Sequence, residues 1–327
     1  MYKKNKIKRK NLLSIIPLNY PLSIDLELTN HCNFSCSFCP IGNRPEYINK
    51  IGFSKIEYKD VEKIVNELKD NNIKLKAFRF SMMGESMLHP EFDKITQLVN
   101  ESKISDYLEL TTNGSTLSQK KILPIIKNKI NVLRVSIYGL NEEDYKYNTN
   151  TRKNNLELIK QNLKNLKKKI EFFGYGPHIY IKSFESDRER MNEFVKQFSN
   201  FADEIGFENG HEWDNNSNMK IPAQSKLDLK ENKKVCSFPF YKAVIHSNGD
   251  FTFCCVDWSR STSVGNIKNN SIYELFNSEL SNNFRRSLVE GKNLNKVCIG
   301  CEFFKSKSYS LDNLDSLSIK EFNKKYV

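Results

Sequence analysis

The chain has 327 residues, of which 39% are hydrophobic, and a formal net charge of +12 at pH 7. This length and apolar content exclude a disordered chain and predict a folded, enzyme-sized protein of about two domains, at roughly 150 residues per domain. The lysines follow helix-like stretches without interleaved aromatics, so the charge indicates a solvated face, or next an affinity for anionic substrates, and argues against a nucleic-acid partner.

Alternating strands and helices are expected after a basic, weakly ordered lead-in over residues 1–20. Strands are predicted at 22–28, 75–82, 107–112, 131–139, 178–184 and 203–208. Helices are predicted at 56–71, 91–102, 117–128, 153–170 and 186–200. Because six strands alternate with helices, residues 21–210 are expected to form a partial (β/α)6, TIM-like barrel of parallel βα units, an α/β fold. The functional loops would then lie at the carboxyl ends of the strands.

The pattern changes after residue 210. Residues 211–235 are polar and strandless, which predicts a linker. A β-hairpin with "SNGD" at its turn is expected within 241–258, and an amphipathic helix within 271–291 that ends at Gly291. We expect a small second domain over 236–305 and a C-terminal tail over 306–327.

The eight cysteines bear on the compartment as well as on chemistry. No stretch approaches the roughly 20 apolar residues that cross a bilayer. The start lacks a proper signal peptide, since Pro17 and Pro21 interrupt its short apolar segment. We therefore expect a cytoplasmic protein with no membrane partner, where clustered cysteines hold metal or do catalysis.

A loop directly after the first predicted strand holds Cys32, Cys36 and Cys39, with three residues and then two between them. Soft thiolates of this kind bind zinc or an iron–sulfur cluster. Structural zinc takes four ligands, and His31 is awkwardly placed beside Cys32 to supply the fourth. Three thiolates on a four-iron cluster would leave one iron open, and an open position is typical of a catalytic metal.

The pattern Cys-x3-Cys-x2-Cys, with Phe38 before the last cysteine, resembles that of the radical S-adenosylmethionine (SAM) enzymes. The resemblance implies that Cys32, Cys36 and Cys39 hold a [4Fe-4S] cluster and that SAM chelates its open iron. It also implies that an electron from this cluster cleaves SAM to methionine and a 5′-deoxyadenosyl radical, which abstracts a hydrogen from the substrate.

Other strand-end loops match the same family. "MGES" at 83–86 resembles its Gly-Gly-Glu-Pro loop, which holds the SAM amino group, although Met83 and Ser86 depart from it. The resemblance implies a SAM site formed by Phe38, Gly84, Glu85, Asn113 and Ser136. The alternatives are an exposed rim glutamate at Glu85, and plain turn or strand polar residues at Asn113 and Ser136.

A second cysteine set lies in the expected second domain: Cys236, Cys254, Cys298 and Cys301. Its spacing around Gly249, and "VGNIKNNSIYELFNS" followed by "CIGC", resemble the SPASM auxiliary-cluster domain. No further cysteine follows, so the resemblance is closer to the shorter twitch variant, a β-hairpin plus helix with one auxiliary [4Fe-4S] cluster. Four cysteines would close that cluster, which implies electron transfer and not substrate binding. A structural zinc site of four cysteines is the alternative.

Cys255 belongs to neither cysteine set. It is expected to be either a buried small apolar residue or the hydrogen-atom donor of a radical epimerase. The first functional hypothesis is dehydrogenation of a small polar substrate, sugar-like or aminocyclitol-like and suited to the basic charge if anionic. Electrons would pass to the auxiliary cluster, and a flavodoxin or ferredoxin would supply the first one. Residues expected near the pocket are Lys182, Arg152, His211 and Trp213, and the general base stays unassigned. The alternatives are the epimerase, a peptide-modifying maturase and a non-enzymatic zinc-binding adaptor.

Overall fold

The computed structural model describes residues 10–42, 44–151, 154–208, 210, 233–299, 301 and 310–326. An eight-stranded sheet runs through this part of the chain in the order β6-β5-β4-β3-β2-β1-β7-β8. The strands are β1 Ser23–Leu26, β2 Ala77–Phe80, β3 Leu108–Thr112, β4 Val132–Ser136, β5 His178–Phe184, β6 Glu204–Glu208, β7 Lys242–Ile245 and β8 Phe251–Thr252.

Strands β1 to β6 are parallel and follow one another in sequence order across the sheet. The predicted partial barrel of six βα units is thereby confirmed. Alternate side chains of strands β1 to β5, such as Ile24 and Leu26 or Phe78 and Phe80, are buried in one large apolar core. Because side chains alternate along a strand, the residues between them lie on the opposite, concave face of the sheet.

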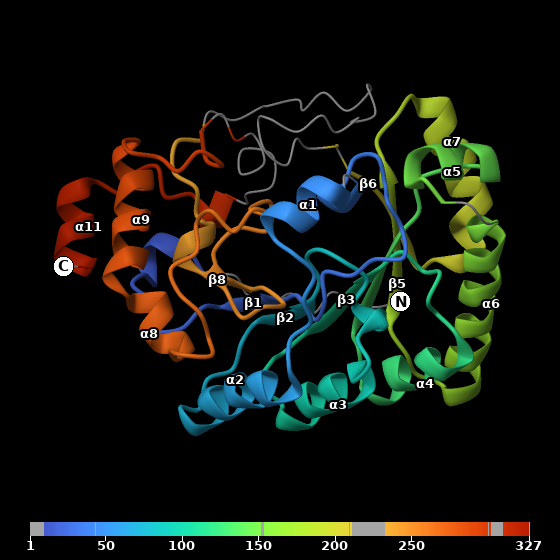
Figure 1. The fold of residues 1–327 in the computed structure, drawn as a ribbon, viewed down its shortest axis with the longest axis horizontal. Helices are drawn as coiled ribbons and strands as arrows, with labels where there is room; N and C mark the ends of the chain where they lie inside the picture. Colours follow the sequence, from blue (N-terminus) through green and yellow to red (C-terminus); the bar gives the residue numbers. More distant parts are fainter. Residues whose placement is uncertain are drawn as a thin grey trace.

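Helices cover the convex face of the sheet, where α2, α3, α4 and α6 lie along its outer side (Figure 1). In α2, Val61, Ile64, Val65 and Leu68 recur at helical spacing and are buried against the sheet. The α-helices are α1 Arg44–Lys50, α2 Tyr58–Asp70, α3 Phe92–Ser102, α4 Gln119–Lys127, α5 Glu142–Thr149, α6 Asn155–Phe173, α7 Arg188–Phe198, α8 Ile272–Asn277, α9 Glu279–Glu290 and α11 Ile319–Tyr326.

The predicted hairpin is formed by β7 and β8, with a turn at 246–250. Gly249 takes a φ of 95°, and the His246 amide donates to the Asp250 carbonyl at 2.9 Å. β7 also pairs in parallel with β1, with Ser23 opposite Lys242 and Leu26 opposite Ile245. The hairpin therefore continues the barrel sheet at its β1 edge and brings the second cysteine set beside the first strand.

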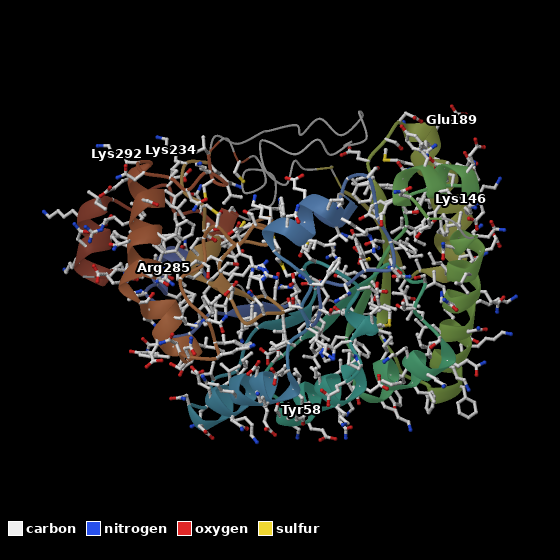
Figure 2. The ribbon with its side chains drawn as sticks, viewed as in Figure 1. Tyr58, Lys146, Glu189, Lys234, Arg285 and Lys292 are labelled. Atoms are coloured by element: carbon white, nitrogen blue, oxygen red, sulfur yellow. The ribbon has the colours of Figure 1, made fainter. Side chains whose placement is uncertain are left out.

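The prediction of one helix within 271–291 is wrong in one respect, because this segment forms two helices, α8 and α9. Ser278 lies between the two helices, with a backbone conformation that is not helical. It ends the first helix and caps the second, because its side chain accepts a hydrogen bond from the Ser281 amide. The end at Gly291 is confirmed, with a left-handed φ of 66°. Arg285 of α9, labelled in Figure 2, is buried at 1% exposure. Its guanidinium lies 4.4 Å from the Phe276 ring centre.

The described residues near the two ends of the chain are more structured than expected. The lead-in was expected to be weakly ordered, but Leu12 and Ile16 are buried in a second apolar cluster with Val235 and Phe322. The expected tail includes α11, whose Phe322 belongs to the same cluster. Within the described residues, no helix combines the length and the apolar character needed to cross a membrane.

Candidate functional site

The three-cysteine loop begins six residues after β1 and is fastened to α5, a helix that the sequence analysis missed. The amide of Ser37 donates to the Asn148 carbonyl at 3.1 Å, and that of Ser35 to the Thr149 carbonyl at 3.4 Å. Arg44 donates to the Cys32 carbonyl at 3.1 Å. Backbone hydrogen bonds of this kind leave no periodic pattern in a sequence, so the contact between α5 and the cysteine loop could not be predicted from it.

Burial perturbs all three thiols of this loop. It raises the pKa of Cys32 to about 12 and that of Cys39 to about 11, and it raises the pKa of Cys36 well above its usual value. A thiolate is therefore costly here unless a positive charge lies beside it. Metal ions supply such a charge, so the donor set fits a metal centre.

The thiols of this loop could serve either of two kinds of metal centre. A zinc ion needs every sulfur about 2.3 Å from a single centre, whereas an iron–sulfur cluster offers each cysteine its own iron. His31 is exposed and stacks on Phe53 with ring centres 4.5 Å apart, so it is turned to a ring and not to a thiol.

Gly84 lies at a close approach between the loop after β2 and the start of the cysteine loop. Its φ is +80°, and a Cβ there would meet the Thr29 carbonyl oxygen at 2.2 Å. The next amide, that of Glu85, donates to the His31 carbonyl at 2.8 Å. Only glycine fits this cradle, which holds the two loops together at the carboxyl end of the sheet.

The alternative interpretation of Glu85, an exposed glutamate at the rim, is wrong, because its side chain is 1% exposed. The carboxylate accepts from the Thr112 hydroxyl at 3.0 Å and from the Asn113 amide at 2.8 Å. Burial raises the pKa of Glu85, although these hydrogen bonds act in the opposite direction. The carboxylate thus ties the loop after β2 to the end of β3.

The remaining predicted SAM contacts lie around the same loop. Asn113 donates to Asn33 at 2.9 Å and has its side-chain nitrogen 4.0 Å from the Cys32 sulfur. The ring of Phe38 lies 4.7 Å from those of Tyr138 and Phe184. Burial raises the pKa of Tyr138, and Ser136, nearby at the end of β4, acts in the opposite direction. The structure therefore brings Phe38, Gly84, Glu85, Asn113 and Ser136 to the rim that holds the three cysteines.

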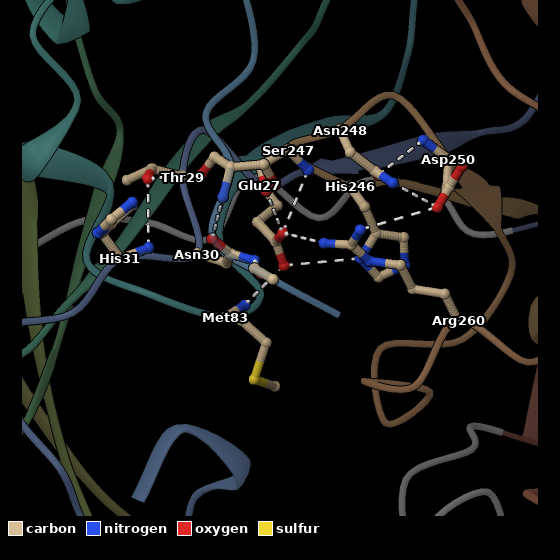
Figure 3. A network of polar contacts seen from close by, with 12 residues as sticks. Glu27, Thr29, Asn30, His31, Met83, His246, Ser247, Asn248, Asp250 and Arg260 are labelled. Carbon is tan, nitrogen blue, oxygen red and sulfur yellow. Dashed lines mark hydrogen bonds and ion pairs between the residues drawn. The ribbon is translucent and has the colours of Figure 1, made fainter. Parts of the chain in front are cut away.

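A buried carboxylate that the sequence analysis missed joins this rim to the hairpin (Figure 3). Glu27, fully buried beyond β1, accepts from the Met83 amide at 3.2 Å and from the Ser247 hydroxyl at 2.7 Å. Arg260 donates to it at 3.3 Å, and His246 lies 3.6 Å away. Burial alone would raise the pKa of Glu27, but His246, Arg260 and Ser247 outweigh it and lower the pKa to about 2. The sequence feature that could have revealed Glu27 is its place in "LEL", where an acidic residue occupies an inward position of a strand.

The second cysteine set is gathered near β7 and β8. The pKa of Cys236 is raised by burial and then by the thiols of Cys298 and Cys301, and that of Cys254 by burial and by Cys255 and Cys236. Such mutual effects require the thiols to be close. Asp257, fully buried, shapes the adjoining loop by accepting from the Thr262 amide at 2.8 Å.

Of the residues expected near the substrate pocket or left without a role, the structure describes Lys182 and Cys255. Lys182 faces the concave side of the sheet and pairs with Glu208 at 3.0 Å. Burial alone would lower the pKa of Lys182, but Tyr138 and Glu208 outweigh it and raise it, so this amine stays protonated at neutral pH. Burial raises the pKa of Cys255, and the nearby Lys242 acts in the opposite direction. Arg152, His211 and Trp213 lie outside the described residues.

Comparison with known families agrees with this geometry. Residues 26–195 match the family model of the radical SAM superfamily. The chain belongs to the radical SAM superfamily. Residues 236–302 match a second model, SPASM, an iron–sulfur cluster-binding domain. These matches confirm the family resemblance, imply SAM and iron–sulfur clusters as cofactors, and favour clusters over structural zinc. No curated protein sequence matches the chain.

Solved structures with the same fold confirm the architecture at low identity. BtrN in complex with AdoMet and 2-DOIA is 15% identical, with a TM-score of 0.52 over 84% of this chain and 91% of that one. SuiB of Streptococcus suis bound to the precursor peptide SuiA is 17% identical, with a TM-score of 0.64 over 92% of this chain and 74% of that one. anSMEcpe with bound AdoMet is 17% identical, with a TM-score of 0.61 over 94% and 93%.

Proposed function

We propose that this radical SAM enzyme dehydrogenates a small polar substrate, sugar-like or aminocyclitol-like, and passes the released electron to an auxiliary [4Fe-4S] cluster. The observation that supports it is the parallel pairing of β7 with β1, which sets the second cysteine set beside the strand that leads into the first. An enzyme that must inject one electron and collect another needs both sets around one substrate.

In this proposal, Cys32, Cys36 and Cys39 hold the cluster that binds SAM. When bound, this cluster supplies the electron that cleaves SAM, and the resulting 5′-deoxyadenosyl radical removes a substrate hydrogen. Gly84 allows the loop after β2 to approach the cysteine loop, and Glu85 fixes that loop against β3. Phe38, Asn113 and Ser136 complete the surface on which SAM rests.

The second cysteine set would hold the auxiliary cluster through Cys236, Cys254, Cys298 and Cys301. Four protein ligands leave no open iron, so this cluster would accept an electron and not bind substrate. Loss of the hydroxyl proton is needed as well. Lys182 stays protonated through its contacts with Tyr138 and Glu208, so it serves as a charge partner and not as the base. A flavodoxin or ferredoxin would supply the first electron.

The test uses aminocyclitols and sugars that carry deuterium at each carbinol carbon, with 2-DOIA, which BtrN binds, among them. Anaerobic enzyme with two clusters should yield 5′-deoxyadenosine containing deuterium and a ketone in equal amount. Cys298→Ala should still cleave SAM but form no ketone. Deuterium transfer without any two-electron-oxidised product would refute the dehydrogenase.

Radical epimerisation is the second candidate, because Cys255 lies beside Lys242 at the concave face and could return a hydrogen atom. In that case the product would gain one solvent deuterium and Cys255→Ala would abolish it. Peptide modification is a third candidate, favoured by the SuiB structure with its precursor peptide. Deuterium transfer from a labelled peptide, and from no small molecule, would establish it.

A further inference from the structure

The concave face of the sheet is lined by charged side chains, one from each of seven neighbouring strands. In the order in which they meet, they are Lys242, Asp25, Arg79, Glu109, Arg134, Glu208 and Lys182. The interior of a TIM-type barrel is normally filled by layers of branched apolar residues. Here the apolar positions of the same strands face the helices instead, so this face is built for something polar.

The outer members of this row are firmly paired. Lys242 lies 2.6 Å and Arg79 3.1 Å from the two oxygens of Asp25. At the other end Arg134 lies 2.7 Å and Lys182 3.0 Å from the two oxygens of Glu208. Each of these carboxylates is thus shared between two cations, and Asp25, at 5% exposure, is the more deeply buried of the two.

The middle of the row is paired much more weakly. Glu109 lies 3.9 Å from the Arg79 Nε and 3.8 Å from the Arg134 Nε, beyond hydrogen-bond length. Within the described residues, each guanidinium donates one hydrogen bond, to Asp25 or to Glu208. A guanidinium has five N–H donors, and these two side chains are 30% and 29% exposed. Four cations face three carboxylates along the row, so the row has one positive charge in excess.

The row also runs from one cysteine set to the other. Lys182 interacts with Tyr138, whose ring contacts Phe38 between Cys36 and Cys39. At the far end, Lys242 lies near Cys255, the neighbour of Cys254. A molecule bound over the middle of the row would therefore lie between the two sets.

We propose that Arg79 and Arg134 bind an anionic group of the substrate, a carboxylate or a phosphate. Planar guanidinium groups offer paired N–H donors that match the oxygens of both anions. Glu109 holds the two arginines side by side and limits their combined charge. The inference rests on the proposed function, since the anion belongs to the molecule that is oxidised, and it narrows that molecule to an acidic sugar or cyclitol, such as a sugar acid or sugar phosphate.

The experiment measures binding without turnover, so its outcome is independent of the dehydrogenase chemistry. Inorganic phosphate and malonate are titrated into the reconstituted enzyme with SAM by calorimetry. We expect at least one of them to bind, and the stronger of the two identifies phosphate or carboxylate as the group. Arg79→Gln and Arg134→Gln should each weaken that binding at least tenfold. Lys121→Gln, which removes one cation from an ion pair with Asp93 at the outer surface, should leave it unchanged.

Retained iron content and SAM binding would show that the variants fold. If either glutamine variant fails this check, Arg79→Lys and Arg134→Lys keep the charge but lose the fork and should weaken binding about threefold or more. The proposal is overturned if neither anion binds, or if the arginine variants bind as tightly as the wild type or no more weakly than Lys121→Gln. Failure of the dehydrogenase assay with intact anion binding would instead refute the proposed reaction alone.

Discussion

Replacing Glu27 by glutamine should destabilise the protein more than any other single change at the rim. The glutamine keeps the shape but removes the charge, and its amide group must face donors from Met83, Ser247 or Arg260. Breaking a buried ion pair costs about 3–5 kcal/mol. The fall in the pKa of Glu27 from 4.5 to about 2 corresponds independently to about 3 kcal/mol.

The sign of the pH dependence follows from that lowered pKa. Glu27 is ionised in the folded protein down to a pH of about 2, whereas in the unfolded chain it takes up a proton near pH 4.5. Its contribution is therefore complete above pH 4.5 and is lost as the pH falls toward 2. The difference in stability between wild type and variant should shrink over the same interval.

Urea unfolding followed by tyrosine and tryptophan fluorescence, at pH 7 and at steps down to pH 3.5, measures this difference. Glu157→Gln is the matched control, since it removes an exposed ion pair with Lys160 on α6 and should have little effect at any pH. A loss below about 1 kcal/mol at pH 7 for Glu27→Gln, or a difference independent of pH, would refute the role assigned to Glu27.

Four further substitutions test the rim and the clusters. Gly84→Ala should lower stability and SAM affinity together, because its Cβ would meet the Thr29 carbonyl; Gly174→Ala, at φ +72° with nothing within 4 Å, should cost less in a thermal melt and leave SAM binding intact. Thr112→Val removes the hydroxyl that serves Glu85 and should cost about 1–3 kcal/mol in the same unfolding assay, and no loss would mean that the buried carboxylate does not depend on it. Cys36→Ala and Cys298→Ala should each remove about four of about eight irons, and an unchanged iron content in either would exclude that cysteine as a ligand.

Local patterns were sufficient for most of the architecture. The strand and helix spacing predicted the six βα units, because apolar residues such as Phe78 and Phe80 alternate in the strands while Val61, Ile64 and Leu68 recur at helical spacing. The spacing of Cys32, Cys36 and Cys39 predicted the superfamily that the family models confirm. Both are properties of short stretches of chain.

What escaped prediction depends on contacts between distant stretches. The pairing of β7 with β1 joins residues more than two hundred positions apart, and nothing in "KAVI" indicates which edge it will choose. α5 was missed because its buried face is small, with Tyr145 and Thr149 alone, yet its end fastens the cysteine loop. Tertiary contact decides such elements.

The row of charged residues on the concave face could have been anticipated from the sequence of the strands. Strands buried on both faces of a parallel sheet usually read as continuous apolar runs, whereas "SIDLEL", "AFRF" and "VLRVS" each place at least one charged residue among their inward positions. Only the structure shows that Arg79 and Arg134 meet around one glutamate.

The central claim is that the three-cysteine loop holds a cluster that cleaves SAM. Anaerobically reconstituted enzyme is mixed with SAM and dithionite, without substrate, and 5′-deoxyadenosine is measured against time by chromatography. Wild type should release it, and Cys36→Ala, with its second cysteine set intact, should release none. A wild-type protein that holds about eight irons and binds SAM, yet forms no 5′-deoxyadenosine, would contradict the account.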